Sequence, residues 1–353
     1  MNAWPAADAP RGPNHQRLLA VDSHDGSVFE TGARELPDLL CPGDLVVVND
    51  AATLPASLRV RSPSGREHEL RIAIAGGPQG WWGVLMGEGD WRTPTEDRPA
   101  PDFVPVGARL TLPDGGHARI AAISELGSRL AQLDWGRSDA EVLALLYAHA
   151  RPIQYSYTRD DLALSDVQTP FGVRPWAVEM PSASRPLDWA ALGRLRKRGI
   201  ELATLTHAAG LSATGDDALD ARLPLPERYE LPARTVEAIA RAHARGGRVL
   251  AIGTTVVRAL EGNAQTHGGQ LVAGPGITDL IIHEGFVPQV VDGLLSGVHE
   301  PGTSHHQVVS AFAPPAAIAA ADTTIARRGL LIHEFGDATL LLPRVASQRC
   351  LAA

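Results

Sequence analysis

The stretch RVLAIGTTVVRALE, residues 248–261, indicates the fold class of this chain. Its first part is an apolar run that ends at Gly253, as expected of a buried β-strand. Thr254 and Thr255 follow, and threonine is well suited to cap the helix that the next residues predict. A strand that leads through a tight turn into a helix is typical of a layered α/β domain.

The same alternation extends to both sides of this stretch. WAVEM (176–180) and ELATLTH (201–207) are strand-like runs that helical patterns separate. Nearer the start, RLLAVD (17–22) and DLVVVND (44–50) are apolar runs bounded by turn residues. Together these segments predict a layered α/β domain, and the fold class is α/β.

A different pattern interrupts this alternation between residues 58 and 135. Short alternating segments, such as HELRIAI and RLAQLDW, are separated there by glycine, proline and aspartate. This spacing is typical of a small antiparallel β-barrel. We therefore predict a discontinuous α/β domain over residues 1–57 and 150–353, with a β-barrel domain inserted over residues 58–149.

The composition predicts a cytoplasmic protein. Of the 353 residues, 44% are hydrophobic, and no apolar run approaches the roughly 20 residues of a membrane helix. The first residues also lack the pattern of a signal peptide. Cys41 and Cys350 are too few for a disulfide framework or a thiolate zinc site, and we expect two lone thiols in a reducing compartment.

The charge argues against a surface that binds polyanions. The net charge is -8, whereas phosphate binding depends on clustered lysine and arginine. One run, RLRKR (194–198), resembles a basic patch, and we interpret it as the solvated end of a helix.

The turn at Gly253 is a candidate anion site, because free N–H groups at a helix start bind anions. Arg258 and Glu261 follow within two turns, and their i, i+3 spacing brings them together on one helix face. A plain strand-to-helix turn with a surface ion pair explains the same residues. Both interpretations stay open from this stretch alone.

Several stretches resemble, in order, the S-adenosylmethionine:tRNA ribosyltransferase-isomerase family of the queuosine pathway. They are GDLVVVND (43–50), LPASL (54–58), AIGTTVVRALE (251–261), VVDGLL (290–295), VHEPGTS (298–304), VVSAF (308–312) and FGDATLLLP (335–343). The resemblance spans nearly the whole chain and implies an α/β domain with an inserted β-barrel. It also implies transfer of the ribosyl part of S-adenosylmethionine to a 7-aminomethyl-7-deazaguanine base in tRNA, with rearrangement to an epoxycyclopentane and release of adenine and methionine.

The resemblance also implies a substrate site. The matching positions include Asn49, Asp50, Gln168, Gly253, Thr254, Thr255, Arg258, Glu261, His299 and Asp337. Gly253, Thr254 and Thr255 would hold the methionine carboxylate, and Arg258 would support an anionic group. Asp50 or Asp337 would orient the ribose or the ammonium group, with Asn49, Gln168 and Glu261 as further substrate-binding residues.

Other polar positions depart from the family pattern. Ala51 and Ala52 stand where the family has Thr-Arg, and Pro186 replaces a histidine. His207 is displaced by one position, which turns a strand side chain to the opposite face. These losses concentrate where a nucleotide would be handled. With the acidic charge they make tRNA a doubtful partner, and they favour a different acceptor or a lyase that acts on S-adenosylmethionine alone.

Three apolar runs end in the dipeptide His-Glu. The dipeptides are His283-Glu284, His299-Glu300 and His333-Glu334. Strand ends line the ligand crevice of open α/β sheets, and these side chains are ligands for Zn, Mn or Fe. A metal held by His283, His299 and His333, in a hydrolase or isomerase, is therefore an alternative. We do not favour it, because adjacent strand residues point to opposite faces and no HExxH helix is present.

His299 is the favoured catalytic base. Histidine titrates near neutral pH and can take a proton from carbon. Among the clustered histidines, His299 alone matches a family position, and in the family chemistry a C5′ proton next to the sulfonium is removed. We interpret His305 and His306 as an adaptation of this chain or a polar helix start. A binding module that kept the fold and lost the chemistry is the third alternative.

Overall fold

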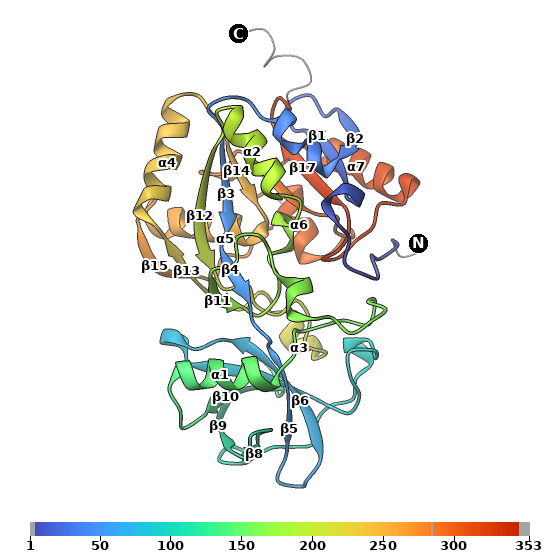
Figure 1. Ribbon diagram of the computed structural model, residues 1–353, viewed down its shortest axis with the longest axis vertical. Coiled ribbons are helices and arrows are strands. Elements are labelled where there is room, and N and C mark those ends of the chain that lie inside the picture. The colour runs from blue at the N-terminus through green and yellow to red at the C-terminus, as the bar shows by residue number, and fades with distance from the viewer. Residues whose placement is uncertain (1–3, 284, 346–353) are drawn as a thin grey trace.

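The computed structural model describes residues 4–283 and 285–345. A β-barrel lies at one end of the molecule, and a large sheet with its helices forms the rest (Figure 1). This arrangement confirms the predicted fold class. The exact domain boundaries stay a prediction. None of the described helices is long and apolar enough to span a membrane.

The large sheet has nine strands. In spatial order they are β15 (Gly274–Thr278), β13 (Glu227–Leu231), β12 (Glu201–His207), β3 (Leu45–Asn49), β14 (Val249–Ile252), β16 (Gly293–Gly297), β17 (Ala338–Leu342), β1 (Arg17–Asp22) and β2 (Val28–Gly32). The four strands from β12 to β16 are parallel. Their carboxyl ends therefore meet at one edge, where open α/β sheets bind ligands.

Helices cover both faces of this sheet, which is why a central strand such as β14 is apolar throughout. In β14, Val249 and Ala251 pack into one apolar core, whereas Leu250 and Ile252 pack into the other. The first core includes residues of α4 (Ala233–Ala244), α5 (Thr254–Thr266), α6 (Ser304–Ser310) and α7 (Pro315–Arg328). The second is covered by α2 (Trp189–Lys197) and the 3₁₀ helix Ala33–Leu39.

The barrel is closed and antiparallel. Its strands, in spatial order, are β10 (Leu130–Asp134), β7 (Trp81–Met86), β6 (Glu67–Ile74), β5 (Ser57–Arg61), β8 (Arg109–Thr111) and β9 (His117–Ile123). Helix α1 (Asp139–His149) follows and packs its apolar side chains on the barrel core. The chain enters through β4 (Ala51–Thr53) and returns through β11 (Arg174–Ala177), which pair as a small parallel sheet. The short helix α3 (Asp217–Asp220) also contacts the barrel core through Leu219.

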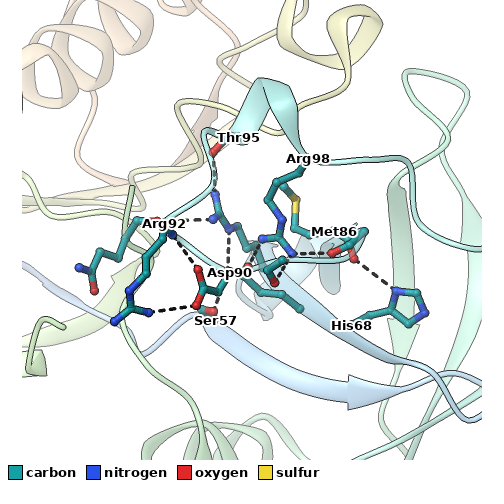
Figure 2. A network of polar contacts seen from close by, with 12 residues as sticks. Ser57, His68, Met86, Asp90, Arg92, Thr95 and Arg98 are labelled. Carbon is teal, nitrogen blue, oxygen red and sulfur yellow. Dashed lines mark hydrogen bonds and ion pairs between the residues drawn. The ribbon is translucent and has the colours of Figure 1, made fainter. Parts of the chain in front are cut away.

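A buried ionic cluster surrounds Glu69, which lies in strand β6 of the barrel. Its carboxylate accepts hydrogen bonds from Arg71 Nε at 2.8 Å and from Arg98. Ser57, Thr95 and Arg98 belong to the same polar network (Figure 2). Burial would raise the pKa of Glu69, but the two arginines more than offset it and hold the pKa at about 2.

Four local expectations are corrected by the structure. The run WAVEM is not a strand over its whole length, because β11 ends at Ala177. The runs before His283 and His333 form no strand, so of the three His-Glu dipeptides only the one at His299 follows a strand, β16. Cys41 is disulfide-bonded, so the expected lone thiol there is wrong. Glu284 and Cys350 lie outside the described residues.

Candidate functional site

A cavity of about 160 Å³ opens at the carboxyl edge of the parallel strands. Its lining includes the turn after β14, the end of β16 and the start of α6. Among the lining residues are Gly253, Thr254, Thr255, Arg258, His299 and His305. The structure therefore brings together much of the set that the sequence singled out, at the edge where the parallel strands end.

The turn at Gly253 presents the start of α5 to this cavity. Gly253 has φ 95°, a left-handed conformation that glycine adopts without strain. It is also the N-cap residue, and no side chain caps the helix. The expected threonine cap is therefore wrong. The first N–H groups of a helix have no partner within it, so this 13-residue helix offers free donors and its positive dipole end to an anion.

Asn49 supports the turn from the end of β3. It is 1% exposed, and its Nδ2 donates to the carbonyl of His207 at 2.9 Å and to Thr255 Oγ1 at 3.3 Å. Its Oδ1 accepts from the N–H groups of Ala51 and His207. Asn49 thus joins β3, β12 and α5 behind the cavity wall.

Arg258 brings a positive charge to the cavity. Its NH1 donates to Glu227, and its Nε donates to the carbonyl of Leu280 at 2.9 Å. Its NH2 is buried and has no hydrogen-bond partner among the described residues. Burial lowers the pKa of Arg258 to about 10, so the group stays charged at neutral pH. Arg258 lines the cavity, and its NH2, which is buried as the structure stands, is the donor left over for an anionic ligand.

His299 lies on the cavity wall after β16. Its Nε2 is 2.9 Å from Ser296 Oγ, and its ring stacks on that of His305 with centroids 4.9 Å apart. Burial lowers the pKa of His299 well below 6.5, and the neighbouring His305, His306 and His333 add to this effect. The imidazole is therefore neutral at neutral pH, which is the state that can accept a proton.

The two following histidines begin a helix. His305 and His306 lie in the first turn of α6, where Thr303 Oγ1 accepts from the N–H of His306. The ring of His306 is 3.2 Å from the carboxylate of Asp322 in α7. His306 thus joins two helices, whereas His305 faces the cavity.

Asp337 and Glu261 do not line the cavity. Asp337 is 1% exposed and accepts from Arg11, Arg17 and the N–H of Leu331. Glu261 is also buried and accepts from the N–H groups of residues 289–291. The expected surface pairing with Arg258 is wrong, because Arg258 is buried and paired with Glu227.

Asp50 and Gln168 also lie outside the cavity lining. Asp50 Oδ1 accepts from Thr206 Oγ1 at 2.5 Å. The Gln168 side chain pairs with the backbone of Thr53, donating to its carbonyl and accepting from its N–H. Both residues hold the connection between the sheet and the barrel, next to β4. Their predicted catalytic or binding roles have no direct contact with the cavity to support them.

The three histidines of the metal alternative are not assembled into a ligand set. Among residues 4–283 and 285–345, no three His, Cys, Asp or Glu side chains are grouped so that they could share a metal ion. His333 instead stacks on Tyr157, with ring centroids 3.9 Å apart. The segments before His283 and His333 form no strand, so the predicted convergence of three strand ends does not arise.

Sequence reasoning missed Glu179, which also lines the cavity. Its Oε1 accepts from Tyr155 OH and from the N–H and Oγ of Ser212, the latter two at 2.9 and 3.2 Å. Burial raises the pKa of Glu179 to about 7. Nothing in WAVEM distinguishes this glutamate, because its partners come from segments far away in the sequence.

This chain is similar over most of its length to proteins that carry a shared description. A family model described as "Queuosine biosynthesis protein" matches residues 3–341. A protein of Gloeobacter violaceus named S-adenosylmethionine:tRNA ribosyltransferase-isomerase is 34% identical over 347 residues, covering 96% of this chain and 92% of that protein. One of the same name from Acidithiobacillus ferrooxidans is 34% identical over 336 residues, covering 93% and 91%.

A solved structure has a similar fold. It is the S-adenosylmethionine tRNA ribosyltransferase of Thermotoga maritima, with a TM-score of 0.51 and 22% sequence identity. The match covers 96% of this chain and 98% of the other. At this identity the likeness supports a shared fold.

Proposed function

This chain belongs to the queuosine biosynthesis protein family, and on that premise we propose that it is a ribosyltransferase-isomerase whose cavity binds S-adenosylmethionine. The reaction begins with deprotonation of C5′ and continues with loss of adenine and transfer or rearrangement of the ribosyl group. One observation supports this most strongly: the open start of α5, Arg258 with its unpaired NH2 and a neutral His299 belong to residues that line the same cavity.

The methionine carboxylate binds at the start of α5. The N–H groups of Thr254 and Thr255, together with the helix dipole, favour a carboxylate there. Arg258 NH2 supplies a charge-assisted hydrogen bond to the same anion. Glu227 holds the rest of the guanidinium, so the free nitrogen is fixed before the ligand arrives.

His299 is the base of the first step. The positive sulfur of S-adenosylmethionine stabilises the ylide that forms when the C5′ proton leaves. A neutral imidazole is required to take this proton, and burial keeps His299 neutral. Ser296, at 2.9 Å from Nε2, orients the ring.

The acceptor is a separate question, and we propose that it is not a tRNA bound through the RLRKR run. In α2, Arg194 is paired with Glu35 and Asp38, and Arg198 with Asp38. These carboxylates neutralise charges that phosphate binding would need. Adenine release from S-adenosylmethionine without any acceptor would identify the protein as a lyase.

The test follows C5′ exchange and adenine release together. Wild-type protein is incubated with S-adenosylmethionine in heavy water, with and without unfractionated tRNA. We expect deuterium at C5′ and free adenine, and both should fall by about a hundred- to ten-thousand-fold in His299→Asn. Binding of S-adenosylmethionine, measured by calorimetry, should persist in this variant.

His306→Asn is the matched control, because His306 lies in the same cluster but joins α6 to α7. A His299→Asn protein that exchanges C5′ as fast as wild type would show that His299 is not the base. Wild-type protein that binds S-adenosylmethionine without exchange or adenine release would instead be a binding module.

A further inference from the structure

Glu179 lines the cavity and has no cationic hydrogen-bond partner among the described residues. It shares the lining with Thr254, Arg258 and His299, but its hydrogen-bond donors are the neutral groups of Tyr155 and Ser212. Neither the bound anion nor the C5′ base of the proposed function accounts for a carboxyl group here. A buried carboxyl without a cationic partner has a raised affinity for a proton.

The hydrogen bonds decide which oxygen of Glu179 carries that proton. Tyr155 OH, Ser212 N and Ser212 Oγ all donate to Oε1. No donor among the described residues reaches Oε2 in this way, Oε2 is not among the sealed atoms, and Glu179 is a lining residue of the cavity. Since the acceptor capacity of Oε1 is already used, a proton bound by Glu179 lies on Oε2, where a ligand can receive it.

We propose that Glu179 is the general acid that protonates the departing adenine, through the proton on Oε2. The inference rests on the proposed function, which supplies the substrate. It assigns the two proton transfers of one reaction to two residues on one cavity wall: His299 removes a proton and Glu179 delivers one.

The step balances without a further reactant. When His299 takes the C5′ proton, the electron pair left at C5′ forms the C4′–C5′ double bond as the C4′–O4′ bond breaks. The O4′ pair forms the C1′ carbonyl, and the C1′–N9 pair leaves with adenine. Adenine then accepts the Glu179 proton on a ring nitrogen. One proton is taken and one is given, so proton exchange with solvent resets both residues.

The groups around Glu179 fit this role. Burial raises its pKa to about 7, and Glu334 contributes to the rise, while the hydrogen bonds from Tyr155 and Ser212 lower it. Tyr157 donates to Glu334 and so holds that carboxylate nearby. The guanidinium of Arg71, in strand β6 of the barrel, lies 5.3 Å from the centre of the Tyr155 ring. A carboxyl that is partly protonated at neutral pH can act as an acid there.

The experiment separates the two proton transfers. In Glu179→Gln, the rate of adenine release should fall by about a hundred- to ten-thousand-fold, while C5′ exchange and binding of S-adenosylmethionine stay near wild type. Glutamine keeps the size of the side chain but has no acid proton. Glu237→Gln on the exposed face of α4 is the control for the substitution itself and should leave both rates unchanged.

The pH dependence gives a second, independent measurement. In wild type, kcat for adenine release should fall as the pH rises above about 7, because the acid form of Glu179 is lost. This limb should be absent in Glu179→Gln. Tyr155→Phe should move the limb to higher pH, since it removes a hydrogen bond that lowers the pKa, and Glu334→Gln should move it to lower pH.

Each result has one meaning. The inference is overturned if Glu179→Gln releases adenine at the wild-type rate. It is also overturned if this variant loses C5′ exchange as strongly as it loses adenine release. If Glu179→Gln does not fold, the other two variants decide. The inference is then overturned if the fall of kcat with pH occurs at the wild-type pH in both Tyr155→Phe and Glu334→Gln. Wild-type protein that shows neither exchange nor adenine release contradicts the proposed function itself.

Discussion

Two glutamates of this protein, the buried Glu69 and the half-buried Glu179, have opposite electrostatic surroundings. Glu69, in strand β6 of the barrel, is held by Arg71 and Arg98, and its pKa is about 2. Glu179, on the cavity wall, receives hydrogen bonds from the neutral donors of Tyr155 and Ser212, and its pKa is about 7. Burial disfavours the charged form of both, so the difference comes from the partners.

The two carboxylates also differ in how their oxygens are used. Both oxygens of Glu69 are occupied, by Arg71 and Ser57 on Oε1 and by Arg98 on Oε2. Glu179 is occupied on one oxygen and open to the cavity on the other. Arg71 lies between them, paired with Glu69 and placed over the Tyr155 ring. The ionic cluster around Glu69 therefore contacts Tyr155, which donates a hydrogen bond to Glu179.

The largest expected effect is a loss of stability when Glu69 is replaced. Glu69→Gln leaves Arg71 and Arg98 buried without a counter-charge, which costs about 3–5 kcal/mol of unfolding free energy. Urea unfolding followed by tryptophan fluorescence measures the loss. Glu179→Gln removes a carboxyl without a cationic partner and should cost much less. Equal losses in the two variants would contradict the distinction between the two sites.

The two glutamates should also give stability opposite dependences on pH. The folded pKa of Glu69 lies below the ordinary value of 4.5, so its contribution, about 3 kcal/mol, is present above pH 4.5 and is lost as the pH falls towards 2. The folded pKa of Glu179 lies above 4.5, so the folded state binds the proton more tightly and stability falls as the pH rises from 4.5 to 7. Unfolding in urea across this range measures both slopes.

Matched variants assign the slopes. Glu69→Gln should flatten the curve below pH 4.5, and Glu179→Gln should flatten it between pH 4.5 and 7. If a slope is unchanged in the variant that should flatten it, another titrating group causes that slope.

Sequence patterns predicted the fold well because they are local. The apolar run before Gly253 and the helical pattern after it correspond to β14 and α5, and the alternating segments correspond to the barrel. The resemblance to the family, rather than local patterns, placed Gly253, Thr254, Arg258 and His299 in one site, and all four line the cavity.

What the sequence did not predict depends on contacts between distant segments. Asp337 was predicted to contact the substrate, yet Arg11 and Arg17 occupy its carboxylate. Glu179 gave no signal, because Tyr155 and Ser212 reach it from two other loops. The partners that decide whether a carboxylate serves structure or chemistry lie far away along the chain, so residue type and spacing do not reveal them.

Arg258 extends the comparison to the arginines. Arg71 has a partner at each of its three nitrogens, whereas Arg258 NH2 has none among the described residues. We expect Arg258→Lys to weaken binding of S-adenosylmethionine by about 1.5–3 kcal/mol, the worth of a hydrogen bond between charged groups. Calorimetry measures the change. Arg71→Lys is the control, and an equal loss of affinity there would show that the unpaired nitrogen is not what binds the ligand.

A smaller effect is expected at the turn itself. Thr255→Val keeps the shape of the side chain but removes the hydroxyl that accepts from Asn49 Nδ2. One such hydrogen bond contributes about 1 kcal/mol, so affinity for S-adenosylmethionine should fall by roughly fivefold while the backbone N–H donors remain. Thr266→Val, at the far end of α5, serves as the control. Unchanged affinity in Thr255→Val would show that Asn49 does not need this contact to hold the turn.

The smallest expected effect concerns the exposed arginines of α2, whose ion pairs should reduce their contribution to tRNA binding. Arg194 is already bound by Glu35 and Asp38, and exposed pairs of this kind contribute at most about 1 kcal/mol. Arg194→Gln should therefore change stability little. If this pairing also prevents α2 from binding phosphates, unfractionated tRNA should bind weakly at physiological ionic strength. The salt dependence of its affinity should be shallow, and Arg194→Gln should not alter it. Filter binding between 50 and 200 mM salt measures this. Tight binding whose salt dependence becomes shallower in Arg194→Gln would show that paired arginines of α2 still contact phosphates, and it would make tRNA the acceptor.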